Sequence, residues 1–136
     1  MTSLPLPALD PDNRAFWTGG EHGQLMISRC NACGHWLHPP VPVCRYCTST
    51  DVEPKPHPGT GTVFSYTVNH QRWLPDQDVP YVLIIVELDD EPDLRFTTRL
   101  VGVDPADERD WIGTRVRVTF EQVDDVWLPV FTPVEE

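Results

Sequence analysis

The chain has 136 residues, with 21 acidic and 10 basic side chains and a formal net charge of −11. Such a charge repels a phosphate backbone, which argues against nucleic-acid binding through a basic surface. No stretch has the length of a transmembrane span, and residues 1–10 lack the layout of a secretory signal, so we expect a cytoplasmic protein. The length fits one domain, or a small module followed by one domain. Fifteen prolines indicate short strands, extended connections and few helices.

The first predicted element is a short helix near the N-terminus. Asp10, followed by proline, is typical of a helix start, and Gly19–Gly20 is expected to end or kink the helix. Phe16 and Trp17 lie in this helix. They either pack on the protein's own core or form anchors that dock on a partner chain. We assign residues 1–24 to this N-terminal helical arm.

All the cysteines of the chain fall into two Cys-x-x-Cys pairs. They are Cys30, Cys33, Cys44 and Cys47. Two such knuckles supply four thiolates to one tetrahedral ion, and Zn²⁺ accepts four sulfur ligands without a geometric preference of its own. The sequence therefore predicts a structural zinc site, with iron held as in rubredoxin as the open alternative. Four protein ligands leave no position for water or substrate, so the site is not expected to be catalytic.

Other interpretations of the cysteines are less favoured. A disulfide inside a Cys-x-x-Cys pair closes a small loop and adds little stability. A redox-active dithiol normally belongs to a single pair in a thioredoxin-like setting, which this sequence lacks. His35 and His38 lie between the knuckles and are interpreted as loop side chains, although either has the chemistry to replace a ligand.

Short strands are predicted on both sides of the first knuckle, at residues 25–28 and 36–38, and a proline-stiffened run leads to the second knuckle. This layout is typical of a zinc ribbon, which we assign to residues 25–53. Such a module has almost no apolar core, so the metal contributes much of its folding free energy. Residues 53–59 carry a proline at every second position from Pro54 and are predicted to form a semi-rigid linker.

From Gly59 onward the hydrophobic pattern has a period of two. Phe64, Tyr66 and Val68 are expected to share the apolar face of the first strand. A short helical insert is predicted at Asp104, between the third and fourth strands. The strands are predicted at residues 64–68, 81–86, 94–100, 115–121 and 127–131. The fold class is thus mostly β, with a five-stranded antiparallel OB-fold barrel over residues 54–136, or a small open sandwich as the alternative.

Charged side chains cluster around the later strands. The acidic run of residues 89–93 is interpreted as a solvated hairpin turn. Four arginines alternate on strand faces and either pair within the chain or form a partner-facing stripe. They are Arg95, Arg99, Arg115 and Arg117. No nucleophile elbow, phosphate-binding glycine loop or open metal site is present in the sequence, so no catalytic residue is predicted.

The combined motifs resemble the zinc-ribbon OB-fold proteins that accompany thiolase-like enzymes, a family first catalogued as a domain of unknown function. The resemblance covers nearly the whole chain. It rests on the ribbon cysteines and on residues 13–17, 61–68, 80–82 and 100–102. The family's metal ligands correspond one by one to the four cysteines, with no departure from the pattern.

The resemblance implies a non-catalytic accessory subunit in a hetero-oligomer with an acyl-CoA enzyme. Thiolases, lipid-transfer-protein-like aldolases and acyl-CoA hydratases are the expected partners, with steroid or lipid side-chain degradation as one setting. His70, Arg72 and Trp73 follow the first barrel strand. They are candidates to contact acyl-CoA or the partner's active-site mouth, or else they form a solvated loop. The alternatives are a direct acyl-CoA carrier and a single-stranded nucleic-acid-binding OB-fold protein.

Overall fold

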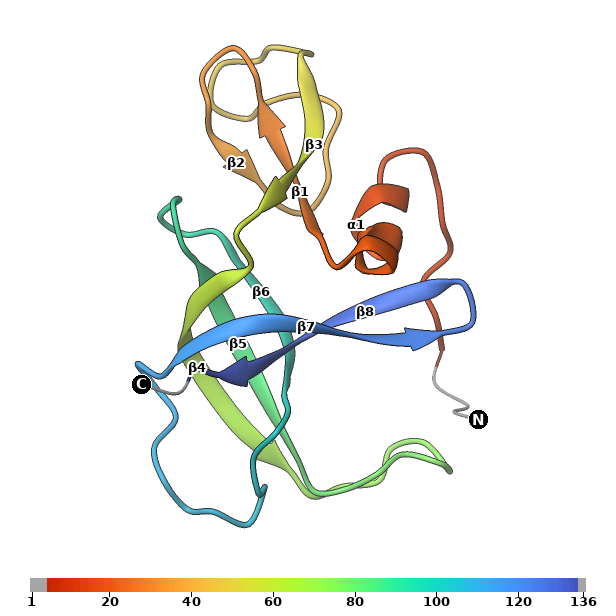
Figure 1. Cartoon of the computed structure of the whole chain (residues 1–136), viewed down its shortest axis with the longest axis vertical. Coiled ribbons are helices and arrows are strands. Elements are labelled where there is room, and N and C mark those ends of the chain that lie inside the picture. Colours follow the sequence, from red (N-terminus) through yellow and green to blue (C-terminus); the bar gives the residue numbers. More distant parts are fainter. Residues whose placement is uncertain (1–4, 135–136) are drawn as a thin grey trace.

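The computed structural model describes residues 5–134, so residues 1–4 of the expected arm lie outside the described residues. A small three-stranded sheet stands above a five-stranded barrel, and a short helix lies beside both (Figure 1). No helix in this range is long and apolar enough to cross a membrane. The elements are α1 (Arg14–Thr18), the 3-10 helix η1 (Gly19–His22), β1 (Leu25–Cys30), β2 (Trp36–Leu37), β3 (Val52–His57), β4 (Thr60–Asn69), β5 (Tyr81–Leu88), β6 (Arg95–Leu100), β7 (Arg115–Val123) and β8 (Val126–Pro133).

The larger sheet is a closed barrel with the strand order β4-β5-β6-β8-β7, and β7 pairs with β4 to complete it. This confirms the predicted barrel over the open sandwich. The sequence reading was wrong on one pairing, because β6 and β8 run parallel and meet at Leu100 and Phe131. That parallel contact follows from the connection between β6 and β7, which crosses one end of the barrel before the β7–β8 hairpin begins (Figure 1).

A β-bulge changes the predicted alternation in β4. The pairing with β5 shifts between Val63 and Ser65, so Phe64 is the extra residue. An extra residue reverses which face the side chains after it point to. Val63 points into the barrel, and Phe64 lies outside it, 47% exposed, with the Arg95 guanidinium 3.8 Å from its ring centre. Tyr66 and Val68 pack against the core as expected.

The helical insert expected near Asp104 is a single hydrogen-bonded turn instead. The Asp107 amide donates to the Asp104 carbonyl at 3.0 Å, and the Ala106 amide donates to the Asp104 carboxylate at 2.9 Å. A side chain that satisfies amides this way favours a turn as readily as a helix. Asp10 behaves similarly, because it accepts from the amides of Asp12 and Asn13 and α1 begins only at Arg14.

The segment predicted as a linker is strand β3. It pairs with the whole of β1, from Val52 opposite Cys30 to His57 opposite Leu25, so the linker prediction is wrong. Proline at alternate positions permits this, because alternate amides of a strand face the same side. Pro54 and Pro56 are two residues apart, so their missing N–H groups fall on the outer edge of a strand that has β1 on its other side.

Helices α1 and η1 fill the corner between the ribbon and the β7–β8 hairpin (Figure 1). Two glycines make this close approach possible. A Cβ on Gly20 would lie 2.5 Å from the Trp127 Cβ and 2.6 Å from the Phe120 ring, and one on Gly19 would lie 2.4 Å from the Gln24 carbonyl. The predicted break at these glycines is therefore a change from α-helix to 3-10 helix that lets the backbone touch the barrel.

Candidate metal centre and the ribbon–barrel contact

The four cysteine sulfurs gather at one point of the ribbon. All four Sγ atoms lie within 4.8 Å of one another. The close pairs join different knuckles, at 3.6 Å for Cys30–Cys47 and 3.6 Å for Cys33–Cys44. Bonded sulfurs would be about 2.0 Å apart, whereas the edge of a tetrahedron of thiolates around Zn²⁺ is about 3.8 Å. The cysteines are therefore positioned to bind one metal ion, as the sequence predicted.

The two knuckles share one backbone pattern. In the first, the Gly34 amide donates to the Cys30 carbonyl at 2.8 Å, and in the second the Thr48 amide donates to the Cys44 carbonyl at 2.9 Å. Both residues have positive φ, 82° at Gly34 and 63° at Thr48. The turn aims backbone amides at sulfur, as the Tyr46 amide does toward Cys44 Sγ at 3.3 Å. Amides pointed at a thiolate stabilise its negative charge, which a metal ligand needs.

The pKa values of neighbouring cysteine thiols are shifted in opposite directions because the sulfurs lie so close together. A hydrogen bond from the Cys33 amide, with further help from neighbouring sulfurs, lowers the pKa of the Cys30 thiol to about 6. The His35 amide lowers the pKa of Cys33, but burial and the neighbouring sulfurs outweigh it and raise that pKa to about 12. One thiolate therefore opposes the next, and a divalent cation among the sulfurs would remove this opposition.

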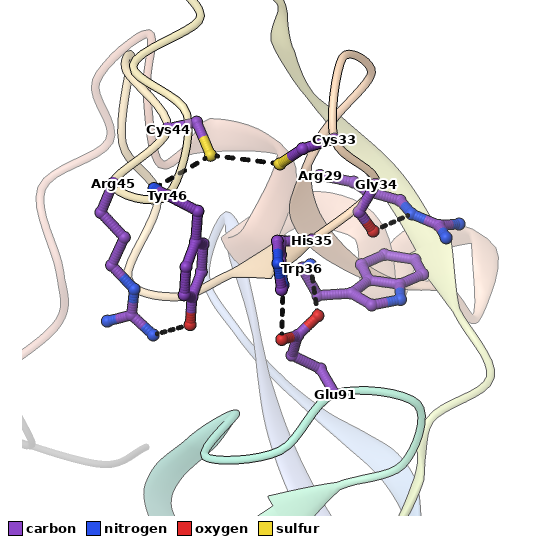
Figure 2. A network of polar contacts seen from close by, with 9 residues as sticks. All are labelled: Arg29, Cys33, Gly34, His35, Trp36, Cys44, Arg45, Tyr46 and Glu91. Carbon is purple, nitrogen blue, oxygen red and sulfur yellow. Dashed lines mark hydrogen bonds and ion pairs between the residues drawn. The ribbon is translucent and has the colours of Figure 1, made fainter.

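Neither histidine between the knuckles belongs to the cluster of metal-binding groups. His35 stacks on Tyr46 with ring centres 3.9 Å apart, and its Nδ1 lies 2.8 Å from a carboxylate oxygen of Glu91. The other Glu91 oxygen accepts from the Trp36 amide at 3.0 Å (Figure 2). Glu91 belongs to the turn between β5 and β6, so one barrel side chain holds two consecutive ribbon residues.

The expectation of a solvated acidic turn is wrong for Asp89 and Glu91, which are bound to the rest of the protein, whereas Asp90 and Asp93 are exposed. The Asp89 carboxylate pairs with Arg115 at 2.6 Å and 2.8 Å and accepts from the Thr60 hydroxyl at 2.6 Å. The Arg115 hydrogen bond is the main reason that the pKa of Asp89 falls to about 2. The backbone carbonyl of Asp89 lies 2.7 Å from Nε2 of buried His57. Because His57 Nδ1 accepts a hydrogen bond from the Gly59 amide, the proton of the neutral ring is on Nε2, which donates to Asp89.

The structure also decides between the two interpretations of the strand arginines, pairing within the chain or a partner-facing stripe. Arg95 pairs with Glu87, and Arg99 pairs with Glu121. Together with Arg115–Asp89, these contacts confirm intramolecular pairing for three of the four arginines.

His38 lies where the ribbon, α1 and the barrel meet. Its ring centre is 4.8 Å from that of Phe16 and 5.2 Å from that of Phe96. Within residues 5–134, Nδ1 is buried without a hydrogen-bond partner. Burial lowers the pKa of His38 to about 4, so the ring is neutral near pH 7.

The other predicted site residues lie in two separate places. Phe16 is 5% exposed and belongs to the core, which supports the local-packing alternative for it. Trp17 is half-buried at the edge of a groove of about 200 Å³ between α1 and the outside of the barrel. His70, Arg72 and Trp73 are exposed in the β4–β5 loop, at the barrel end away from the ribbon (Figure 1). A larger cavity of about 740 Å³ adjoins this loop, although none of the three lines it.

Sequence reasoning missed Glu91, His57 and the interfacial position of His38. A carboxylate in a hairpin turn looks the same in sequence whether it is solvated or bound. The histidines carry no local motif, so nothing near them in the sequence marks either as buried.

Two sequence families match consecutive parts of the chain. Residues 17–53 match the rubredoxin-like zinc ribbon domain of ChsH2, and residues 55–121 match the C-terminal OB-fold domain of ChsH2. The chain is 38% identical over 130 residues to a probable enoyl-CoA hydratase alpha subunit of Thermomonospora curvata. It is 37% identical over 129 residues to the 3-oxo-4,17-pregnadiene-20-carboxyl-CoA hydratase alpha subunit of Mycobacterium tuberculosis. Each alignment covers 95% of this chain but 40% of the relative.

Solved structures give a closer match in length. A chain of the Ltp2-ChsH2(DUF35) aldolase is 39% identical, with a TM-score of 0.79, and the match covers 94% of this chain and 98% of that one. A protein of unknown function from the DUF35 family of Sulfolobus solfataricus shares the fold at 15% identity and a TM-score of 0.59. The zinc ribbon and the closed barrel are the two domains that the family models describe, and the chain belongs to the ChsH2 (DUF35) family of zinc-ribbon OB-fold proteins.

Proposed function

We propose that this chain is a non-catalytic subunit that binds and supports a lipid-transfer-protein-like or other thiolase-fold enzyme acting on acyl-CoA. The observation that carries the proposal is its 39% identity to a chain of the Ltp2-ChsH2(DUF35) aldolase, over 98% of that chain. A steroid or lipid side-chain substrate fits the second curated relative, whose name specifies a pregnadiene carboxyl-CoA hydratase. The cytoplasm is the proposed compartment, because reduced thiolates need a reducing environment.

The metal in this proposal is Zn²⁺, with a structural role. Four cysteines fill a tetrahedral shell, and two of them, Cys30 and Cys44, are buried. The site then has no free coordination position, so the ion supplies rigidity to the knuckles and no bond-making step. Iron is the competing ion, and elemental analysis of purified protein distinguishes the two.

Contact residues for the partner are proposed at two places. Trp17 offers an aromatic edge beside the groove between α1 and the barrel. His70, Arg72 and Trp73 offer a polar and aromatic loop at the far end of the barrel. Phe16 is left out of the contact set because its side chain is buried under the helix.

Co-expression with thiolase-fold enzymes encoded near this gene tests the proposal. We expect one of them to co-purify in a fixed ratio and to gain solubility or acyl-CoA turnover relative to the same enzyme alone. A partner equally active and soluble by itself, with no co-elution on gel filtration, would contradict the accessory role.

The alternative of an acyl-CoA carrier makes a different prediction. Calorimetry of the isolated chain would then give micromolar binding of acyl-CoA without any partner. Single-strand binding is disfavoured because the Arg95 guanidinium lies over the half-exposed Phe64 ring, and Tyr66 packs on the core with its hydroxyl donating to the Arg109 carbonyl. Trp73 alone is then no row of stacking aromatics. Tight single-stranded DNA binding at low salt would overturn that judgement.

A further inference from the structure

The β4–β5 loop presents one unusually exposed tryptophan. Trp73 is 73% exposed, more than any other large hydrophobic side chain within residues 5–134. Burial of this apolar area against another molecule would be favourable in water. Tryptophan is also the residue type most enriched at the energetic centres of protein interfaces.

Gln77 makes hydrogen bonds to several parts of the loop. Its side-chain oxygen accepts from the Trp73 amide at 3.1 Å, and its side-chain nitrogen donates to the Tyr81 hydroxyl at 3.3 Å. Its backbone amide donates to the Leu74 carbonyl at 3.1 Å, and its carbonyl accepts from Arg72 Nε at 2.9 Å. All four polar groups of Gln77 are thus used to fix the chain around Trp73.

The indole ring itself is also oriented. Trp73 Nε1 donates to the Asn69 side-chain oxygen at 3.3 Å, and the Asn69 side-chain nitrogen donates to the Gln71 carbonyl at 2.9 Å. A side chain that is already ordered loses less conformational entropy when a partner covers it. The hydrogen bonds of Asn69 and Gln77 therefore give the loop the geometry of a preformed anchor.

The charges beside Trp73 indicate what kind of surface fits. Asp76 and Asp78 belong to the same loop, line the cavity of about 740 Å³ and are exposed. Neither forms an ion pair within the part of the chain that the structure describes. Arg99 lines the same cavity but is paired with Glu121. Arg72, next to Trp73, also forms no ion pair among these residues and donates to the Gln77 carbonyl, so the unpaired charges of the loop are two carboxylates and one guanidinium, and their sum is negative.

This charge disfavours several occupants. A second copy of the chain would bring another −11 and the same acidic loop to the contact. Nucleic acid and anionic lipid would be repelled for the same reason. A protein surface with basic side chains around an apolar pocket fits both the indole and the two carboxylates.

We propose that residues 70–80 form a preformed docking element for a partner protein. Trp73 enters an apolar pocket of the partner, and Asp76 and Asp78 pair with lysine or arginine side chains at the rim of that pocket. Gln77 is a positioning residue that keeps the indole in its exposed orientation. This inference rests on the proposed function, because it states how the accessory chain would recognise its enzyme.

The test uses the full-length chain and the enzyme that co-purifies with it. Trp73→Ala should weaken the complex about 30-fold, as expected for a central interface anchor. Phe64→Ala is the matched control, since it removes a half-exposed aromatic from the barrel wall and should change affinity less than about twofold. Affinity is measured by biolayer interferometry, and unchanged circular dichroism shows that both variants are folded.

A second variant tests the charge. Asp76→Asn combined with Asp78→Asn should weaken binding about fivefold at low salt and flatten its dependence on ionic strength. Gln77→Ala retains the indole but should also weaken binding, and faster amide hydrogen exchange across residues 70–80 would show that the loop has been released.

The possible results distinguish failure of the docking element from failure of the proposed accessory role. If the wild-type chain binds the enzyme and Trp73→Ala binds it with the same affinity, the docking element is overturned and the accessory role stands. The same holds if Phe64→Ala weakens binding as much as Trp73→Ala does. Failure of the wild-type chain to bind any thiolase-fold enzyme would overturn both. A dimer of the isolated chain that Trp73→Ala abolishes would assign the loop to self-association instead.

Discussion

The knuckle end of the ribbon and the interior of the barrel are stabilised by different means. Around the cysteines, the buried cluster is Leu37 with Cys30 and Cys44, supported by Val41 and Val52. The barrel core is far larger and contains the inward side chains of its strands. A cluster of this small size cannot offset the conformational entropy of the knuckle loops without a metal ion.

The two regions meet within the ribbon sheet itself. Leu25, Ile27 and Trp36 come from ribbon strands but pack in the barrel cluster. The β1 strand thus has one end in the apolar core and the other, Cys30, at the metal site. We therefore expect loss of the metal to unfold the knuckle end of the ribbon, and loss of core packing to unfold the barrel.

The largest expected effect comes from removing a buried ligand. Cys44→Ser should abolish stoichiometric metal binding, because three thiolates and a hydroxyl hold Zn²⁺ far less tightly than four thiolates, and structural zinc contributes about 10–16 kcal/mol in isolated finger peptides. Elemental analysis gives the metal content. Hydrogen exchange should show lost protection in residues 30–51 and retained protection in β4–β8. Equal loss across the barrel would contradict the separation of the two regions.

The opposite experiment removes core packing and spares the metal. Phe131 is fully buried and sits at the parallel contact of β6 with β8. Phe131→Ala should destabilise the whole chain by about 4 kcal/mol through lost burial and a cavity. Chemical denaturation followed by tryptophan fluorescence measures this, with half-exposed Phe64→Ala as the control expected to lose about 1 kcal/mol, the contribution of its contact with Arg95. Matching losses in the two variants would argue that Phe131 is not a core residue.

A smaller effect is expected at the contact that joins the regions. Glu91→Ala leaves the Trp36 amide and His35 without their acceptor and should cost about 2 kcal/mol, with faster exchange of ribbon amides. Glu91→Gln keeps an oxygen for the Trp36 amide and should lose about half as much. Glu108→Ala, at an exposed position, is the control. Ribbon exchange unchanged in Glu91→Ala would show that apolar packing alone holds the ribbon in place.

Local sequence signals predicted the main architecture. Two Cys-x-x-Cys pairs specify the metal cluster because ligand spacing is a local property. Alternating side chains in β7 and apolar runs in β5 predict barrel strands, because burial has a period of two along each strand. The capping and glycine signals around α1 placed a helix there to within a few residues.

The errors arose where distant residues decide the local state. Proline at alternate positions is compatible with a linker or an edge strand, and the presence of β1 beside Pro54 and Pro56 decides for the strand. The Phe64 bulge has no marker in its own sequence. Glu91 acts on residues more than fifty positions earlier, so no pattern near it reveals the contact.

The smallest expected effect is a pH dependence of stability at the junction of the two regions. The folded-state pKa of His38 is about 4, because burial disfavours its charged form, whereas an unfolded histidine titrates near pH 6.5. Between these values the unfolded chain binds a proton that the folded chain refuses, so stability falls as pH is lowered from about 6.5 to about 4. Below about 4 both states are protonated and this contribution stays constant.

His38→Phe keeps an aromatic ring between Phe16 and Phe96 and removes the titration. The difference in unfolding free energy between the variant and wild type should therefore grow by about 1–2 kcal/mol from pH 7 to pH 4.5, a figure reduced for the partial exposure of the ring. Urea denaturation at several pH values measures it. Acid also releases the metal from the knuckles, and because both proteins carry the same cysteines, that loss cancels in the difference. A difference that is constant with pH would mean that His38 binds a proton as readily in the folded protein as in the unfolded chain, and so that water reaches its ring at the ribbon–barrel junction.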